Sequence, residues 1–187
     1  MGDPTSTPSS SSTPTLASDL RATPDPNPPA VRPADPVEFE RLRWIEFESD
    51  HLYLDVGIGP FSEDETANHL PVAAAVFAVG EPAVGFVSLE IVDGVAHVDQ
   101  VSVLPDHGRR GLGRALLEAA VGWAAASGYP ALTLITYRDV PWNAPFYRTL
   151  GFEEVTDLSP GLAAIRSHEE DAGLDSFGPR LAMRRVL

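Results

Sequence analysis

Two residue types are missing from this 187-residue chain: it has no cysteine, and all 13 of its basic residues are arginine, so it has no lysine. The first absence excludes disulfides, cysteine nucleophiles, thiolate zinc sites and iron–sulfur clusters. The second excludes a P-loop, which needs its lysine on the phosphates, and enzymes that form a Schiff base through a lysine amine.

Positive charge is scarce as well, because 27 acidic residues outnumber the 13 arginines and give a formal net charge of −14. Nucleic-acid recognition starts from a basic surface, so we expect no nucleic-acid partner. An anionic ligand would have to be met by a local cluster of arginines or of backbone N–H groups.

Long apolar runs are absent too. No stretch approaches the roughly 18 to 20 apolar residues that span a bilayer, and the N-terminus lacks a charged-then-apolar leader pattern. We therefore expect a cytoplasmic protein with no membrane association. Residues 1–28 are rich in Ser, Thr and Pro and contain no aromatic residue. This composition predicts a disordered tail, followed by one folded domain over residues 29–187.

Hydrophobic periodicity predicts a mixed α/β domain. A capping box at Asp35-Pro36-Val37-Glu38 predicts a helix that runs to about Ser49, and Asp93-Gly94 predicts a tight hairpin. A second capping signal at 62–65 predicts the start of a shorter helix. Further helices are predicted at 112–127, 142–150 and 160–172, and strands at 73–79, 84–92, 97–103, 131–137, 152–155 and 180–186. Together they predict a mostly antiparallel central sheet flanked by helices, with one parallel β-α-β unit formed by 97–103, the following helix and 131–137.

The segment most informative about function is residues 101–116, where a strand runs into a glycine-rich turn that opens a helix. Three of the 13 arginines, Arg109, Arg110 and Arg114, lie within six residues here. Glycines let the backbone approach a ligand closely, and the free N–H groups of a helix N-terminus attract anions. This pattern favours phosphate binding but is not a Rossmann fingerprint, since Leu116 stands where the third glycine belongs. The alternative is a connecting loop with a solvated arginine face.

Two motifs in this order resemble the GNAT superfamily of acetyl-CoA-dependent N-acetyltransferases: Val103-x-Pro105 with Gly111-Leu112-Gly113-Arg114-Ala115-Leu116, and later the run Phe146-Tyr147-Arg148-Thr149-Leu150-Gly151-Phe152. The similarity covers about residues 30–187. It implies a GNAT-like fold and acetyl-CoA as co-substrate. The residues that it assigns to the pantetheine arm are Val101, Ser102 and Val103, and those assigned to the pyrophosphate are Gly108, Arg109, Arg110, Gly111, Leu112, Gly113 and Arg114.

The chain departs from the family pattern at two places. Gly108 occupies a position that usually carries Gln or Arg, and Val140 stands where the family often has Asn. Asn143, one helical turn closer to the tyrosine, is the candidate to replace that asparagine in contacting the cofactor.

Acyl transfer needs a neutral amine, a stabilised oxyanion and a proton for the leaving thiolate. The resemblance places Tyr147 as the general acid, although a half-buried aromatic with a satisfied hydroxyl is the alternative. His97 and Asp99 share one strand face by period-two alternation, and the resemblance puts His97 where some members carry a catalytic Glu. His97 and Asp99 are therefore the candidates for a general base. The alternative is that His97 is a purely structural residue. No pair of histidines in the sequence has the spacing of metal ligands.

The acceptor is expected to be a primary amine of a small molecule or a peptide. The resemblance places the acceptor groove beside acidic segments. A cationic amine would fit this charge, but ordinary solvated faces of an acidic protein are the favoured interpretation. The residues concerned are Glu46, Glu48, Asp50, Asp55, Glu63, Asp64, Glu65, Glu169, Glu170 and Asp171. A non-catalytic CoA-binding sensor or interaction module, and a structural domain that binds nothing, are the competing hypotheses. The family often dimerises, and residues 180–186 are a candidate dimer strand.

Overall fold

The computed structural model describes residues 30–60 and 69–187 and contains a seven-stranded sheet in the order β1-β2-β3-β4-β5-β7-β6. The strands are β1 Val31–Pro33, β2 Ala75–Val79, β3 Gly85–Val92, β4 Val95–Val103, β5 Ala131–Tyr137, β6 Glu153–Val155 and β7 Arg180–Val186. The α-helices are α1 Phe39–Leu54, α2 Leu112–Ala126, α3 Ala144–Arg148 and α4 Pro160–Asp171. This is the mixed α/β fold class that the periodicity predicts.

Strand pairing follows the predicted directions. In the described part of the chain β4 and β5, which α2 connects, form the single parallel pair, and every other neighbouring pair is antiparallel. A parallel pair needs a crossover connection, which α2 provides. The sheet is therefore antiparallel on both sides of one parallel β-α-β unit.

The β3–β4 hairpin has the predicted turn, with φ of 51° at Asp93 and 74° at Gly94. The pairing then contains an irregularity that the sequence did not predict. Leu89 pairs with Val98 but Ser88 pairs with Gln100, so Asp99 is an extra residue that forms a β-bulge. Bulges bend a strand and are common beside functional sites.

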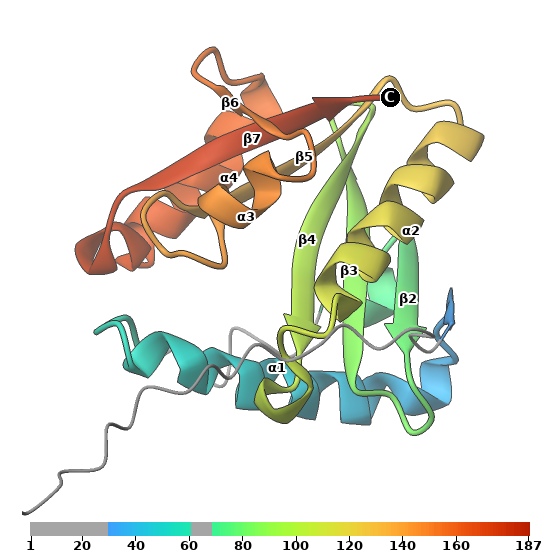
Figure 1. Ribbon diagram of the computed structural model, residues 1–187. Coiled ribbons are helices and arrows are strands. Elements are labelled where there is room, and N and C mark those ends of the chain that lie inside the picture. Colours follow the sequence, from blue (N-terminus) through green and yellow to red (C-terminus); the bar gives the residue numbers. More distant parts are fainter. Residues whose placement is uncertain (1–29, 61–68) are drawn as a thin grey trace, which may run out of the picture.

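Helices cover both faces of the sheet (Figure 1). The apolar stripe of α2, including Leu116 and Ala120, is buried against β2, β3, β4 and β5 and forms the main core. On the other face α1 packs Leu42 and Ile45 against Phe86 of β3 in a smaller cluster. None of the helices in the described ranges is long and apolar enough to span a membrane.

The predicted capping box is confirmed at the entry to α1. Asp35 accepts a hydrogen bond from the Val37 N–H, and Glu38 accepts one from the Asp35 N–H. The helix then continues one turn beyond the predicted end at Ser49, to Leu54. The predicted helix at 62–65 and the predicted tail at 1–28 lie outside the described residues.

The last strand, β7, lies inside the sheet between β5 and β6. Its residues pair with β5 along the whole of Arg180–Val186, and residues 182–184 also pair with β6. A sheet edge is what a second chain would add to, and this strand does not present a free one. Most of the strand's hydrogen-bonding capacity is thus used within the chain, and a role of residues 180–186 in a dimer stays a prediction.

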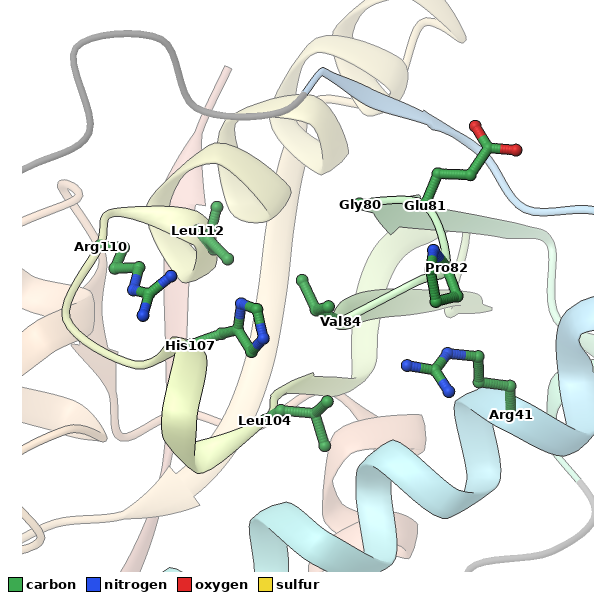
Figure 2. Close-up of a pocket in the computed structure, with 9 residues that line it drawn as sticks. All are labelled: Arg41, Gly80, Glu81, Pro82, Val84, Leu104, His107, Arg110 and Leu112. Atoms are coloured by element: carbon green, nitrogen blue, oxygen red, sulfur yellow. The ribbon is translucent and has the colours of Figure 1, made fainter.

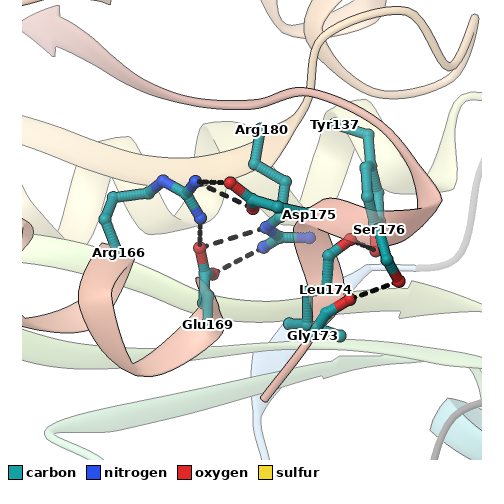
Figure 3. A network of polar contacts seen from close by, with 8 residues as sticks. All are labelled: Tyr137, Arg166, Glu169, Gly173, Leu174, Asp175, Ser176 and Arg180. Atoms are coloured by element: carbon teal, nitrogen blue, oxygen red, sulfur yellow. Dashed lines mark hydrogen bonds and ion pairs between the residues drawn. The ribbon is translucent and has the colours of Figure 1, made fainter. Parts of the chain in front are cut away.

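An ion-pair network holds the start of β7 against α4 (Figure 3). Glu169 accepts hydrogen bonds from Arg180 Nη2 at 2.6 Å and from Arg166 Nη1, and Arg166 also pairs with Asp175 at 2.7 Å. The Arg180 guanidinium lies 4.5 Å from the centre of the Tyr137 ring. The charge of Glu169 is thus matched by two arginines.

Candidate active site

The glycine-rich segment forms an open turn between β4 and α2. A short 3-10 turn at Pro105–His107 ends at Gly108, and Arg109 and Gly111 follow with φ of 60° and 84°. Gly111 is the N-cap of α2, and no side chain caps this end of the helix. The first N–H groups of a helix have no acceptor within the helix, so those of α2 are available to an anion.

The three arginines of the turn add positive charge without neutralising partners. Arg110 donates to the Asp106 carbonyl at 3.0 Å and Arg114 donates to the Thr149 hydroxyl at 3.1 Å. Among the residues that the structure describes, none of Arg109, Arg110 and Arg114 forms a salt bridge. In a chain of net charge −14 they make a local positive region at the N-terminus of α2.

A pocket of about 510 Å³ lies beside this turn (Figure 2). Arg110 and His107 face it from the turn, Arg41 faces it from α1, and Val84 and Leu104 line its apolar side. The turn between β2 and β3 closes the remaining side, so the pocket lies on the β3 side of β4 rather than between β4 and β5. Its cationic rim extends the positive region of the turn.

Strands β4 and β5 separate beside the turn. They pair only over Ala96–Val98 with Leu132–Leu134, and Figure 1 shows them diverging beyond this point. The later part of β4, which contains Val101, Ser102 and Val103, pairs with β3 on one side alone. Its backbone groups that point toward β5 therefore lack strand partners, so an extended ligand could pair with them.

Tyr147 lies on α3, inside the core on the α2 side of the sheet. Its ring packs against Phe152 and Phe146, and burial raises the pKa of its phenol, which keeps the hydroxyl protonated. That hydroxyl has no hydrogen bond to any other described residue. A protonated phenol without a protein partner is able to donate to a ligand atom, as the predicted general acid must.

Asn143, immediately before α3, is buried and turns its side chain toward α1. Its Nδ2 donates to the Tyr53 hydroxyl at 3.0 Å, and that hydroxyl lies 3.1 Å from Asn143 Oδ1. The structure thus joins Asn143 to α1 rather than to the glycine-rich turn. Its predicted contact with the cofactor stays a prediction.

The two candidate bases on β4 have different surroundings. His97 is buried, its Nδ1 lies 2.9 Å from the Thr133 hydroxyl, and burial lowers its pKa to about 4. Asp99, on the bulge, is partly exposed and accepts a hydrogen bond from the Ser88 hydroxyl at 3.0 Å. The bulge thus leaves the carboxylate accessible where β4 leaves β5, while the histidine is enclosed.

Acidic residues gather around Asp99 on the α1 side of the sheet. Glu46 of α1 is buried although its side chain is ionisable, and Asp50 follows it by one helical turn. His69 lies between two carboxyl groups, with its Nε2 3.8 Å from Glu46 Oε2 and 3.6 Å from Asp99 Oδ2. Within the described residues, no three potential ligands are arranged to hold a metal ion.

The electrostatics of this cluster favour neutral carboxyl groups. Burial, with the nearby charges of Asp50 and Asp99, raises the pKa of Glu46 to about 9, and burial raises the pKa of Asp50 to about 6. Glu90 of β3 also has a raised pKa because of burial and Asp99. A cation that entered the cluster would favour the ionised carboxylates.

Replacing Glu46 by glutamine should raise the free energy of unfolding at pH 8 and change it little at pH 4. The raised pKa means that the folded chain holds a proton that the unfolded chain, at an ordinary pKa of 4.5, has lost, so stability falls as the pH rises through this window. If the pKa of a group is higher by one in the folded chain than in the unfolded chain, the free energy of unfolding changes by about 1.4 kcal/mol. We expect the substitution to raise the free energy of unfolding at pH 8, measured with urea, by at least that amount. The exposed Glu40→Gln is the control, and identical pH slopes for wild type and E46Q would contradict the prediction.

Two residues of this cluster, His69 and Ser88, are not predicted from the sequence as part of the site. Both residues join the cluster only through contacts between distant segments of the chain, and nothing in their local sequence marks them as site residues. Glu46 had a recognisable pattern, because it occupies the helical stripe of Leu42, Ile45 and Ser49 that faces the sheet. A carboxylate at a core-facing position of an amphipathic helix indicates a functional site or a buried pair.

The sequence matches the model of the acetyltransferase (GNAT) family over residues 35–152, which is more than half of the chain. Solved structures share the fold. A GNAT acetyltransferase of Staphylococcus aureus Mu50 is 16% identical with a TM-score of 0.63, over 84% of this chain and 98% of that one. The ribosomal-protein-S18-alanine N-acetyltransferase of Escherichia coli is 20% identical with a TM-score of 0.60, over 84% and 92%.

The PaiA N-acetyltransferase of Thermoplasma acidophilum, solved in complex with coenzyme A, is 17% identical with a TM-score of 0.61, over 84% of this chain and 98% of that one. The matched segment of the family model contains the glycine-rich turn, the separated strands and Tyr147. On this match and this architecture, the chain belongs to the GNAT acetyltransferase family.

Proposed function

We propose that this chain is an N-acetyltransferase that moves an acetyl group from acetyl-CoA to a primary amine by direct attack within a ternary complex. The observation that carries the proposal is the uncapped N-terminus of α2, with three arginines that form no salt bridge among the described residues, beside the strands β4 and β5 where their pairing has ended. A phosphate-rich ligand with a long extended arm fits this combination. Membership of an acetyltransferase family, and the CoA bound to the PaiA structure, agree with it.

The co-substrate's pyrophosphate would lie on the N–H groups of residues 111–114, beside Arg109, Arg110 and Arg114. Its extended arm would pair with the unpaired backbone of β4 at Val101–Val103, which brings the thioester to the bulge at Asp99. These contacts use backbone groups that the fold leaves without partners. They therefore need no specific side chain in place of Gly108.

In the transfer, the amine nitrogen bonds to the thioester carbonyl carbon and the carbon–sulfur bond breaks. The sulfur leaves as a thiolate and takes a proton from the Tyr147 hydroxyl, and the nitrogen loses a proton as the amide forms. The nitrogen's proton passes to solvent and the phenolate takes up a proton from solvent, so the net reaction of the neutral amine neither gains nor loses a proton. Burial raises the pKa of the Tyr147 phenol, so the hydroxyl still carries its proton when the thiolate forms.

A thiol-release assay with acetyl-CoA and a panel of amines tests the proposal. Because the chain has no cysteine, all thiol that appears comes from CoA, and because it has no lysine, its own side-chain amines cannot be acetylated. Amine-dependent thiol release is the expected result. A melting shift with acetyl-CoA but no release with any amine would favour a non-catalytic CoA-binding module, and no melting shift would favour a domain that binds nothing.

Replacing Gly111 by alanine should weaken acetyl-CoA binding about tenfold or more. Its φ of 84° is costly for a residue with a Cβ, by about 1–2 kcal/mol, and relaxing that strain would displace the N–H groups that face the pyrophosphate. Gly122→Ala is the matched control, because it adds the same methyl group to the same helix at an exposed position with nothing within 4 Å. Calorimetric titration with CoA measures both, and equal affinities would contradict this account of the turn.

A further inference from the structure

Helix α1 is apolar at both ends and acidic in the middle. Near its start, Leu42 and Ile45 pack into one hydrophobic cluster, and after its end Ile58 packs with Tyr137 into another, to which Tyr53 of α1 adds its ring. Between them Glu46 and Asp50 interrupt the apolar contacts on the side that faces the sheet. A core that continued through this region would carry apolar side chains here, because burying a carboxylate is costly without a partner.

Two buried polar atoms in this region lack hydrogen bonds within the described chain, Glu46 Oε2 and His69 Nε2. The Glu46 side chain is only 8% exposed, so neither bulk water nor the described part of the chain supplies a hydrogen-bond partner for Oε2. The Nε2 atom of His69 lies 3.8 Å from Glu46 Oε2, which is too far for a hydrogen bond. Buried polar groups are nearly always satisfied, so atoms that lack a partner indicate the place of a ligand.

The charged groups around these atoms are predominantly acidic. Asp50 lies on α1, Asp99 on β4 and Glu90 on β3, and Arg43 of α1 provides the opposing positive charge. The Nε of Arg43 is also buried without a hydrogen bond. His97 also lies within the electrostatic influence of Asp99, and its ring is held by the Thr133 hydroxyl. A ligand that carries a carboxylate would be repelled here, whereas an ammonium group would relieve the repulsion between the acids.

The cluster borders the position where acetyl transfer would occur. Asp99 is the bulged residue at which β4 begins to separate from β5, so the carboxylates and the proposed thioester position meet at one point of the strand. Asp50 lies one turn farther along α1, about 5–6 Å from Glu46 between Cβ atoms. That spacing is comparable with the separation of two amino groups joined by three or four carbons.

We propose that Glu46, His69 and Asp99 bind the reacting amino group of the acceptor as an ammonium ion, and that the acceptor is an aliphatic diamine whose second ammonium lies beside Asp50. The reaction of the bound amine rests on the proposed acetyl transfer, whereas the binding of the diamine does not depend on it. The ammonium transfers one proton to a carboxylate or to His69, and the neutral nitrogen then attacks the thioester as described above. That proton passes to solvent, so the net reaction consumes a diammonium ion and releases a proton.

The test is calorimetric titration of the full chain, saturated with CoA, with three ligands of one length: 1,4-diaminobutane, 1-aminobutane and 4-aminobutanoate. The diamine should bind at least tenfold more tightly than the monoamine, and 4-aminobutanoate should bind more weakly than either. Equal affinities of diamine and monoamine, or a preference for 4-aminobutanoate, would overturn the assignment. Acetylation of a short basic peptide without measurable diamine binding would replace it with a peptide acceptor.

Two variants locate the ammonium groups. Glu46→Gln should weaken binding of both amines at least tenfold, whereas Asp50→Asn should lower the diamine's affinity to that of the monoamine and leave the monoamine unaffected. Glu40→Gln, an exposed change of the same kind on the same helix, should alter neither. If E46Q does not fold, the selective effect of D50N decides the question, and wild-type affinities in both variants would overturn the proposal.

The same titrations separate this inference from the proposed function. Diamine binding without acetyl-CoA binding would contradict the acetyltransferase proposal and leave the cationic site in place. Acetyl-CoA binding and turnover of other amines without diamine binding would contradict only the assignment of the acceptor.

Discussion

Tyr147→Phe should lower kcat by about 100-fold or more, in the range that general acids contribute, while leaving the affinity for CoA nearly unchanged. The substitution removes one hydroxyl that has no hydrogen bond to any other described residue, and it retains the ring that packs against Phe146 and Phe152. Folding should therefore be little affected. The leaving thiolate would lose its nearest proton donor.

Thiol release with the amine that turns over fastest in the panel measures this effect, and a melting shift with CoA measures cofactor binding. Tyr129→Phe provides a matched control, because that tyrosine packs its ring on Trp123 just after the end of α2 and lies outside α3. A wild-type kcat for Y147F would remove Tyr147 from the role of acid. A loss of CoA affinity equal to the loss of kcat would instead assign it to binding.

Glu169→Ala should lower the free energy of unfolding by about 3 kcal/mol, since removing one partner of a buried ion pair leaves its opposite charge uncompensated. Glu169 is 13% exposed and receives hydrogen bonds from both Arg166 and Arg180, whose side chains are 16% and 12% exposed. Without it Arg166 keeps Asp175, but Arg180 loses its carboxylate partner and keeps its contacts with Tyr137. Arg180 opens β7, so its displacement loosens the strand that pairs with β5.

Urea unfolding measures this change, and thermal unfolding should show a decrease of roughly 10 °C for a chain of this size. Glu170→Ala is the control, because the neighbouring glutamate is exposed and its removal deletes the same charge. A difference between the two variants below about 1 kcal/mol would mean that the network in Figure 3 contributes no more than surface ion pairs do.

Local sequence patterns were sufficient for most of the secondary structure. The amphipathic period of α2, the Asp93-Gly94 turn and the capping box at Asp35 each act over a few residues, and the structure contains all three. The glycine-rich turn is also local, because Gly111 adopts its positive φ beside the strand and helix that flank it. The parallel direction of β4 and β5 followed from the helix between them.

The insertion of β7 between β5 and β6 could not be predicted in this way. β6 precedes β7 in the chain, so the simplest expectation is that each new strand adds to the edge of the sheet. The order depends instead on contacts between segments far apart in sequence, among them the pairing of Ala131 with Val186. Such contacts leave no periodic pattern in either segment.

By itself, the sequence determined the classes of chemistry that are absent, the elements of an α/β domain and the anion-binding turn, because each depends on residue type or on neighbours within a helical turn or a strand. Only the tertiary structure decided which candidate groups meet. Folding enclosed His97 against Thr133, left Asp99 accessible through a bulge, and brought Glu46 and His69 to it. Burial and the approach of like charges, which shift the pKa values of those groups, arise only when distant segments pack together.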